Sequence, residues 1–115
     1  MNIDSVDFAD EIVASFGYKP EDKEVSLTFR SFTYMERVVT KSHTLKISSW
    51  SQAQSRNYGD TKFDGLEEHL GVPSLLLDYS FRDDFCSLVI NTVDDRYIEL
   101  KFYEAQVEFA ESIIS

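Results

Sequence analysis

The first segment with a clear hydrophobic pattern is residues 4–16, where apolar side chains recur at the spacing of a helix. Phe8, Ile12 and Phe16 are four residues apart, which places them on one stripe of an α-helix. Asp4 is a good N-cap, and the glycine after Phe16 is the residue type that ends a helix in the left-handed conformation. The pattern predicts an N-terminal helix that packs its apolar stripe on the rest of the fold.

The hydrophobic period then changes to two, which is the primary signal of strands. Val25, Leu27 and Phe29 point to one side of the chain, and the residues between them are polar. Two further strands are predicted over residues 37–40 and 44–49, joined by a short polar connection. This part of the chain is therefore expected to form a meander of hairpins.

The next segment, residues 50–60, follows neither period, so a loop or an irregular edge strand is predicted there. Thr61 and Asp64 have the spacing of a capping box, and a glycine and a proline end the apolar stripe that follows. These signals predict a second, short helix. Its apolar stripe consists of Phe63, Leu66 and Leu70.

The C-terminal third shows the most regular alternation. Apolar residues occupy every second position over residues 75–81, 86–90 and 98–102, and acidic turns separate the three runs. The apolar positions then shift by one, which predicts a β-bulge near 103–105. The tail, 110–115, is expected to fray.

Together these elements predict a single α+β domain over residues 1–115. It is expected to be an antiparallel β-sheet meander of five or six strands, with the N-terminal helix packed on one face and a short second helix. A chain of this length buries one hydrophobic core. The residues predicted to form that core are Phe8, Ile12, Leu27, Leu77, Leu88, Ile90, Leu100 and Phe102.

The charge of the chain is strongly negative and unevenly distributed. Its 21 acidic and 11 basic residues give a formal net charge of −10. Residues 25–58 carry +4, from five basic side chains and Glu36, so the two flanking segments together carry −14. Direct binding to nucleic acid or to an anionic membrane requires a basic footprint, and the charge argues against both. A high net charge confers solubility by itself, and it also predicts a negative face for a cationic partner.

The expected compartment is the cytoplasm. The apolar runs are too short to span a bilayer, and the first residues are acidic where a secretory signal would be basic. The single Cys86 has no partner for an internal disulfide and falls in the alternation of a strand. This position predicts an inert, half-buried thiol.

Side chains suited to catalysis or metal binding are not clustered in the sequence. His43 and His69 are isolated and Cys86 is far from both, so no metal site and no cofactor are expected. Ser42 beside His43 has the residue types of a nucleophile and its base, but the pair falls in a predicted turn without a nucleophile elbow. The four glycines are isolated, which excludes a glycine-rich nucleotide loop. The protein is predicted not to be an enzyme.

The residues predicted to contact a partner lie in the irregular segment and the short helix after it. Trp50 and Tyr58 are candidate aromatic anchors, because Trp and Tyr beside charge are typical of interfaces. In the alternative interpretation, Trp50 closes the end of the core. The acidic residues that would frame the anchors with negative charge are Asp60, Asp64, Glu67 and Glu68.

Two segments give the chain a resemblance to known proteins: His-Thr-Leu-Lys-Ile-Ser-Ser-Trp at 43–50 and Tyr-Ile-Glu-Leu-Lys-Phe-Tyr-Glu-Ala-Gln-Val-Glu-Phe at 97–109. In a short acidic chain, they resemble the small acidic immunity proteins of bacterial polymorphic toxin systems, including those of contact-dependent growth inhibition. The resemblance implies a cytosolic, non-enzymatic protein that binds a toxin domain, often a cationic nuclease, and blocks it. It includes no defining motif, so no functional residue is carried over.

The leading hypothesis is an immunity or inhibitor protein that neutralises a cationic toxin domain through an acidic surface with aromatic anchors. It is expected to be a monomer or a weak dimer. The first alternative is a nucleic-acid mimic that inhibits a host defence protein, which would carry carboxylates in rows along a helix or strand. The second alternative is a small hydrolase, which would need two carboxyl groups that converge in a deep pocket.

Overall fold

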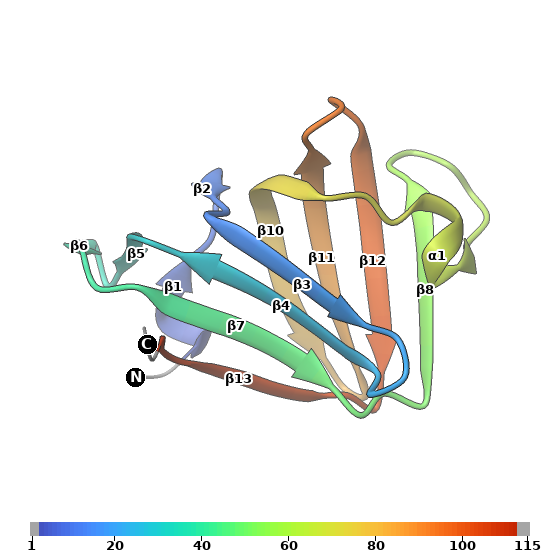
Figure 1. Ribbon diagram of the computed structural model, residues 1–115, viewed down its shortest axis with the longest axis horizontal. Coiled ribbons are helices and arrows are strands. Elements are labelled where there is room, and N and C mark those ends of the chain that lie inside the picture. Colours follow the sequence, from blue (N-terminus) through green and yellow to red (C-terminus); the bar gives the residue numbers. More distant parts are fainter. Residues whose placement is uncertain (1–2, 113–115) are drawn as a thin grey trace.

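Two antiparallel β-sheets pack face to face in the computed structural model, which describes residues 3–112 (Figure 1). A four-stranded sheet lies in front of a six-stranded sheet in this view, and their strands cross at an angle. Strands make up 60% of the protein and helices 6%, so the predicted α+β class is wrong. The antiparallel pairing that the sequence predicted is present in all three sheets.

The six-stranded sheet has the order β2-β10-β11-β12-β8-β9. Its strands are β2 (Glu11–Ile12), β8 (Gln52–Asn57), β9 (Asp64–Gly65), β10 (Pro73–Arg82), β11 (Phe85–Thr92) and β12 (Tyr97–Tyr103). The four-stranded sheet, β13-β7-β4-β3, contains β3 (Ser15–Lys19), β4 (Glu24–Phe29), β7 (His43–Ser48) and β13 (Gln106–Glu111). A small sheet joins β1 (Val6–Asp7), β5 (Phe32–Tyr34) and β6 (Arg37–Val39). The described helices are the 3-10 turn η1 (Ile3–Ser5) and helix α1 (Leu66–His69).

The hydrophobic core lies between the two large sheets and follows the alternation seen in the sequence. On β4, Val25, Leu27 and Phe29 are buried, and the residues between them are partly exposed. Burying apolar surface contributes about 25 cal/mol per Å², so this alternation fixes which face of each strand turns inward. Strands β11 and β12 form the opposite wall with Cys86, Leu88, Ile90, Ile98, Leu100 and Phe102.

Most of the predicted core is confirmed, with two exceptions. Ile12 is 70% exposed, and Leu77 is only partly buried. Ile12 lies in the segment that was predicted to be a helix, and Leu77 lies in a strand whose alternation is interrupted. The confirmed residues are Phe8, Leu27, Leu88, Ile90, Leu100 and Phe102.

The helix predicted over residues 4–16 does not form, and this segment instead supplies η1, β1, β2 and the start of β3. Local bonds favour turns here. The Asp7 carboxylate accepts a hydrogen bond from the backbone N–H of Ala9 at 2.9 Å, and Asp10 has a left-handed φ of 59°. An isolated helix of this length is only marginally stable, so tertiary pairing decides the conformation.

Long-range contacts determine which apolar side chains of this N-terminal segment are buried. The Phe8 ring lies 5.6 Å from the ring of Phe29 and 5.4 Å from that of Phe109, in the core. Ile12 lies on β2, which pairs with β10 at the edge of the six-stranded sheet. Of the apolar residues that resemble one helical stripe in the sequence, Phe8 therefore lies after β1, Ile12 on β2 and Phe16 on β3.

Residues 50–60, predicted to be a loop or an irregular edge strand, contain the regular strand β8. It pairs with β12 along its whole length and with the short β9 on its other side. Opposite the core residues Phe102 and Leu100, its inward positions are Ala53 and Ser55. Because these inward side chains are small and one is polar, β8 shows no alternation of apolar and polar residues, and the sequence pattern did not reveal the strand.

The predicted second helix is present but is a single turn, α1, with Gly65 at its N-cap. No side chain caps it, so the predicted capping box is wrong. The Asp64 carboxylate instead lies 2.8 Å from Nε2 of His69. Leu66 is the residue of this helix that reaches the core.

Strand β10 contains two irregularities that change which leucine faces the core. Its register with β11 shifts between Pro73 and Leu75 and again between Leu76 and Asp78. As a result Leu76 is fully buried, and Leu77 lies on the outer face of the sheet. The uninterrupted alternation predicted from the sequence is therefore wrong at Leu77, because a bulge inserts one residue without a hydrophobic signal.

The phase shift predicted to be a bulge near 103–105 is instead the passage of the chain from one sheet to the other. Strand β12 ends at Tyr103 in the six-stranded sheet, and β13 begins at Gln106 in the four-stranded sheet. Glu104 turns the chain with a left-handed φ of 54°, and its backbone N–H donates to the Asp84 carbonyl at 2.6 Å.

The tail over residues 110–115 is only partly described. Its first two residues belong to β13, which pairs with β7. The backbone N–H of Ser112 donates to the Ser42 carbonyl at 2.8 Å. The remaining residues of the tail that was expected to fray, 113–115, lie outside the described residues.

The thiol of Cys86 is fully buried on the inner face of β11, deeper than the half-buried position predicted. Burial raises its pKa from 9.0 to about 12, because an apolar environment disfavours the thiolate. The group is therefore protonated at neutral pH, which agrees with the inert thiol expected from the sequence.

The register of β10 is testable by comparing two neighbouring leucines. Leu76→Ala is expected to lower the free energy of unfolding by about 2–5 kcal/mol, because it leaves a cavity in the core. Leu77→Ala is expected to cost less than about 1.5 kcal/mol, because this side chain is partly exposed. Urea denaturation of the two variants measures both effects. Equal costs, or a larger cost at Leu77, would contradict the bulge.

The buried thiol predicts a loss of stability in alkaline solution. A pKa raised from 9.0 to about 12 stabilises the fold fully below pH 9, and this contribution is lost as the pH rises towards 12. The free energy of unfolding should therefore fall by up to about 1.4 kcal/mol per pH unit from this group. Cys86→Ala should be less stable at pH 7 and show a flatter decline above pH 9 in urea unfolding. Parallel pH profiles for the two proteins would contradict the assignment.

Candidate functional site

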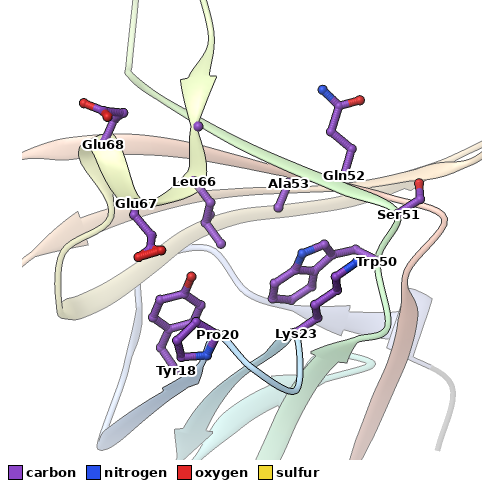
Figure 2. Close-up of a pocket in the computed structure, with 11 residues that line it drawn as sticks. Tyr18, Pro20, Lys23, Trp50, Ser51, Gln52, Ala53, Leu66, Glu67 and Glu68 are labelled. Carbon is purple, nitrogen blue, oxygen red and sulfur yellow. The ribbon is translucent and has the colours of Figure 1, made fainter.

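A cleft of about 350 Å³ opens beside the connection by which the chain passes from β7 of one sheet to β8 of the other. Figure 2 shows that it lies between the turn from β3 to β4, the connection from β7 to β8, and helix α1. Segments that are far apart in the sequence therefore meet here. The cleft is lined by Tyr18, Pro20, Lys23, Trp50, Ser51, Gln52, Ala53, Gly65, Leu66, Glu67 and Glu68.

The side chain of Trp50 forms the floor of this cleft. It is 7% exposed, and its ring packs against Phe102 with centroids 4.9 Å apart. The preceding residue is fixed as well, because the Ser49 backbone N–H donates to the Lys23 carbonyl at 3.0 Å. Trp50 therefore closes the end of the core, as the alternative interpretation of the sequence proposed, and presents a small part of its ring to the cleft.

Tyr18 and Glu67 connect the two sides of the cleft. The Tyr18 hydroxyl and the Glu67 carboxylate face each other across the cleft (Figure 2). Burial, and then the negative charge of Glu67, raise the pKa of Tyr18 above its ordinary value of 10.0. The hydroxyl is therefore protonated at neutral pH, and it brings β3 of one sheet close to α1 beside the other.

Helix α1 is held in place by the buried side chain of Ser55 on β8. The Ser55 hydroxyl oxygen lies 2.9 Å from the carbonyl oxygens of Gly65 and Leu66, and it accepts the backbone N–H of His69 at 3.3 Å. On the far side of the turn, the Arg96 guanidinium donates to the His69 carbonyl at 3.2 Å. These bonds give the acidic side chains of α1 a defined position at the edge of the sheet.

Three of the predicted contact residues come together at this cleft. Trp50 forms the floor, while Glu67 and Glu68 lie on the helix beside it. Figure 2 shows the Glu67 carboxylate pointing into the cleft towards Tyr18 and the Glu68 carboxylate pointing away. The two adjacent glutamates therefore face different surfaces: Glu67 faces the cleft and Glu68 faces away from it.

The other predicted contact residues lie further along the same edge. Tyr58, at the end of β8, is 64% exposed, and Asp60 lies in the exposed loop that follows. Both line a recess on the outer face of the six-stranded sheet rather than the cleft. Asp64 lies between the two surfaces, paired with His69 at 2.8 Å. The predicted set thus lies on β9 and α1 and on the connections before and after β8, along one edge of the sheet.

The turn from β3 to β4 contributes residues that the sequence analysis did not select. Tyr18, Pro20 and Lys23 line the cleft opposite Trp50. They reach it because β4 pairs with β7, which brings the turn beside the end of β7. No local signal indicates this contact, since it depends on pairing across the sheet.

The cleft offers a ligand an aromatic floor, a tyrosine hydroxyl and a carboxylate. Within residues 3–112, no three His, Cys, Asp or Glu side chains converge in a way that could hold a metal ion. A carboxylate pair for hydrolysis would need both groups to face one substrate, and Glu68 points away from the cleft. What remains is a recess with one aromatic floor, a tyrosine and a carboxylate.

Comparison of the chain with protein-family models, curated proteins and solved structures finds no match. In the described part of the chain, no helix has the length and apolar character needed to cross a membrane.

Truncation of the two candidate anchors is expected to have different effects on stability. Trp50→Ala should lower the free energy of unfolding by about 3–5 kcal/mol, because its ring is packed on Phe102. Tyr58→Ala should change it by less than about 0.5 kcal/mol, because the side chain is exposed. Chemical denaturation followed by circular dichroism measures both. A large cost at Tyr58, or none at Trp50, would show that the burial of these residues differs from that described.

Proposed function

We propose that the protein is a cytoplasmic inhibitor of the immunity-protein type that binds a cationic toxin domain through the edge formed by β8, β9 and α1. One observation carries the proposal. The carboxylates of Asp60, Glu67 and Glu68 form no ion pair with any residue of the described chain, and they flank the exposed Tyr58 and the cleft. Uncompensated carboxylates attract a basic protein during encounter, and aromatic contacts then slow its release.

Residues 52–69, which contain this edge and its connecting loop, carry four acidic side chains against Arg56 and Lys62, so the edge is negative. Arg56 bonds Glu99 at 2.7 Å, and Arg96 bonds Asp94 at 2.8 Å. Glu24, on the other sheet, pairs with both Lys46 and Lys19. A charged face of this kind raises association rates with an oppositely charged partner by steering its approach.

The arrangement favours an inhibitor over the two alternatives. The carboxylates of residues 60–68 come from a loop, a short strand and a helical turn, so they do not form the row along one element that a nucleic-acid mimic would carry. At the cleft, the hydrolase interpretation would require two converging carboxyl groups, and Glu67 and Glu68 diverge there. Neither alternative makes use of the exposed Tyr58.

Co-expression tests the proposal directly. The probe is the product of the gene immediately upstream, provided that this gene encodes a large secreted protein with a variable C-terminal domain; that domain is produced in cells with and without this protein. Cells that make the toxin domain should survive only when the protein is present. Survival that does not depend on the protein would reject the inhibitor function.

The acidic edge predicts a kinetic signature in binding to that domain. The triple variant Asp60→Asn, Glu67→Gln and Glu68→Gln should lower the association rate constant about tenfold and reduce its dependence on salt. The dissociation rate should change much less, because exposed charges act mainly on encounter. Surface plasmon resonance at several ionic strengths measures both rates.

A matched control separates this edge from the net charge of the chain. The triple variant Asp10→Asn, Asp83→Asn and Asp84→Asn changes the net charge equally but alters exposed acids away from β8, β9 and α1. Its association rate should stay within about twofold of the parent protein. Equal slowing by the two triple variants would show that overall charge, rather than this edge, directs binding.

A further inference from the structure

The outer face of the six-stranded sheet carries a second recess that is separate from the cleft. One part, of about 540 Å³, is lined by Tyr58, Leu77, Asp78, Val89 and Tyr97. A larger part, of about 710 Å³, shares Tyr58, Asp78 and Val89 with it and continues over the loop after β8. None of the cleft residues lines either part. We call the two parts together the tyrosine recess.

Two exposed tyrosines form one side of the tyrosine recess. Tyr58 is 64% exposed and Tyr97 is 54% exposed. They are neighbours, because the backbone N–H of Tyr58 donates to the Tyr97 carbonyl at 2.8 Å. Large aromatic side chains left in water beside an apolar floor of Leu77 and Val89 are suited to cover the stem of a long side chain.

The charge that remains in the recess is negative. Glu99 is neutralised by Arg56, whose Nε and Nη2 lie 3.0 and 2.7 Å from one carboxylate oxygen. Arg56 also donates to the Asp60 carbonyl at 2.7 Å, and its guanidinium lies 4.3 Å from the centre of the Phe63 ring. The carboxylates of Asp78 and Asp60 have no ion pair within residues 3–112. The recess therefore combines aromatic walls with two free negative charges.

We infer that the tyrosine recess receives an arginine side chain presented by a protein partner, with its guanidinium against Tyr58 and Tyr97 and its charge towards Asp78. Charge complementarity selects a cation, and the apolar floor selects one with an aliphatic stem. Arginine fits better than lysine, because its planar group stacks on aromatic rings and bonds a carboxylate through two N–H groups. The inference depends on the proposed function in one respect, namely that the arginine comes from a cationic protein partner.

The test uses the isotopically labelled full chain and the peptide acetyl-Gly-Arg-Gly-amide at low ionic strength. Saturable amide chemical-shift changes are expected around Tyr58, Asp78, Val89 and Tyr97. The Kd should be on the order of millimolar, because a single side chain supplies few contacts. The same peptide with citrulline in place of arginine keeps the shape without the charge, and it should bind about tenfold more weakly.

Two variants assign the binding to the recess. Asp78→Asn keeps the shape of an exposed side chain and should weaken arginine-peptide binding about fivefold. Asp83→Asn is the matched control, since it removes one exposed acid at the far end of the β10–β11 hairpin. Asp83 has a φ of 50°, which Asn also adopts readily. Its binding should equal that of the parent protein.

Three results would overturn the inference: equal binding of the citrulline peptide, equal effects of Asp78→Asn and Asp83→Asn, or tighter saturable binding of maltotriose at the same residues. The last would show that the recess is a sugar site. The titration needs no toxin domain. If the arginine peptide does not bind, the inhibitor proposal is unaffected and is still decided by the co-expression test. Conversely, arginine binding without protection of cells would retain the recess and reject the inhibitor function.

Discussion

The packing of β4 and β7 against β11 and β12 is the interaction on which the rest of the structure depends. Because side chains alternate along a strand, burying one face of each strand places the other face in solvent. Burial of Ile98, Leu100 and Phe102 on β12 therefore sets the outer face of that strand. The residues left there are Tyr97, Glu99, Lys101 and Tyr103, of which Glu99 pairs with Arg56 and Lys101 lies over the rings of Phe63 and Phe85.

Arg56 connects this outer face to the edge that carries the predicted contact residues. It joins Glu99 on β12 to the loop after β8, through the Asp60 carbonyl, and its guanidinium covers the Phe63 ring. One basic side chain thus positions the loop that carries Tyr58. On the other side of β8, Ser55 holds α1, so the cleft and the tyrosine recess share one supporting strand.

The sequence was informative where one face of a strand is apolar and the other is polar, as in β4, β7, β11 and β12. It misled where the local pattern had two interpretations. The four-residue spacing of Phe8 and Ile12 suits a helix, yet only pairing with β10 and contact with distant rings decide their positions. Strand β8 had no apolar pattern, because Ala53 and Ser55 take its inward positions. Such elements are specified by their neighbours rather than by their own residues.

The two candidate surfaces divide in the same way. Asp60, Glu67 and Glu68 are close in sequence, so the sequence alone could group them, whereas Tyr18 reaches the cleft only through the pairing of β3 with β4. The tyrosine recess depends on a still less visible feature. The irregularity between Leu76 and Asp78 turns Leu77 from the core to the outer face, beside Asp78, whose partner on β11 is Val89. The extra residue that made the core prediction fail at Leu77 therefore also places the Leu77 side chain next to the Asp78 carboxylate on the outer face. Regular alternation would have kept these two neighbours on opposite faces of the sheet.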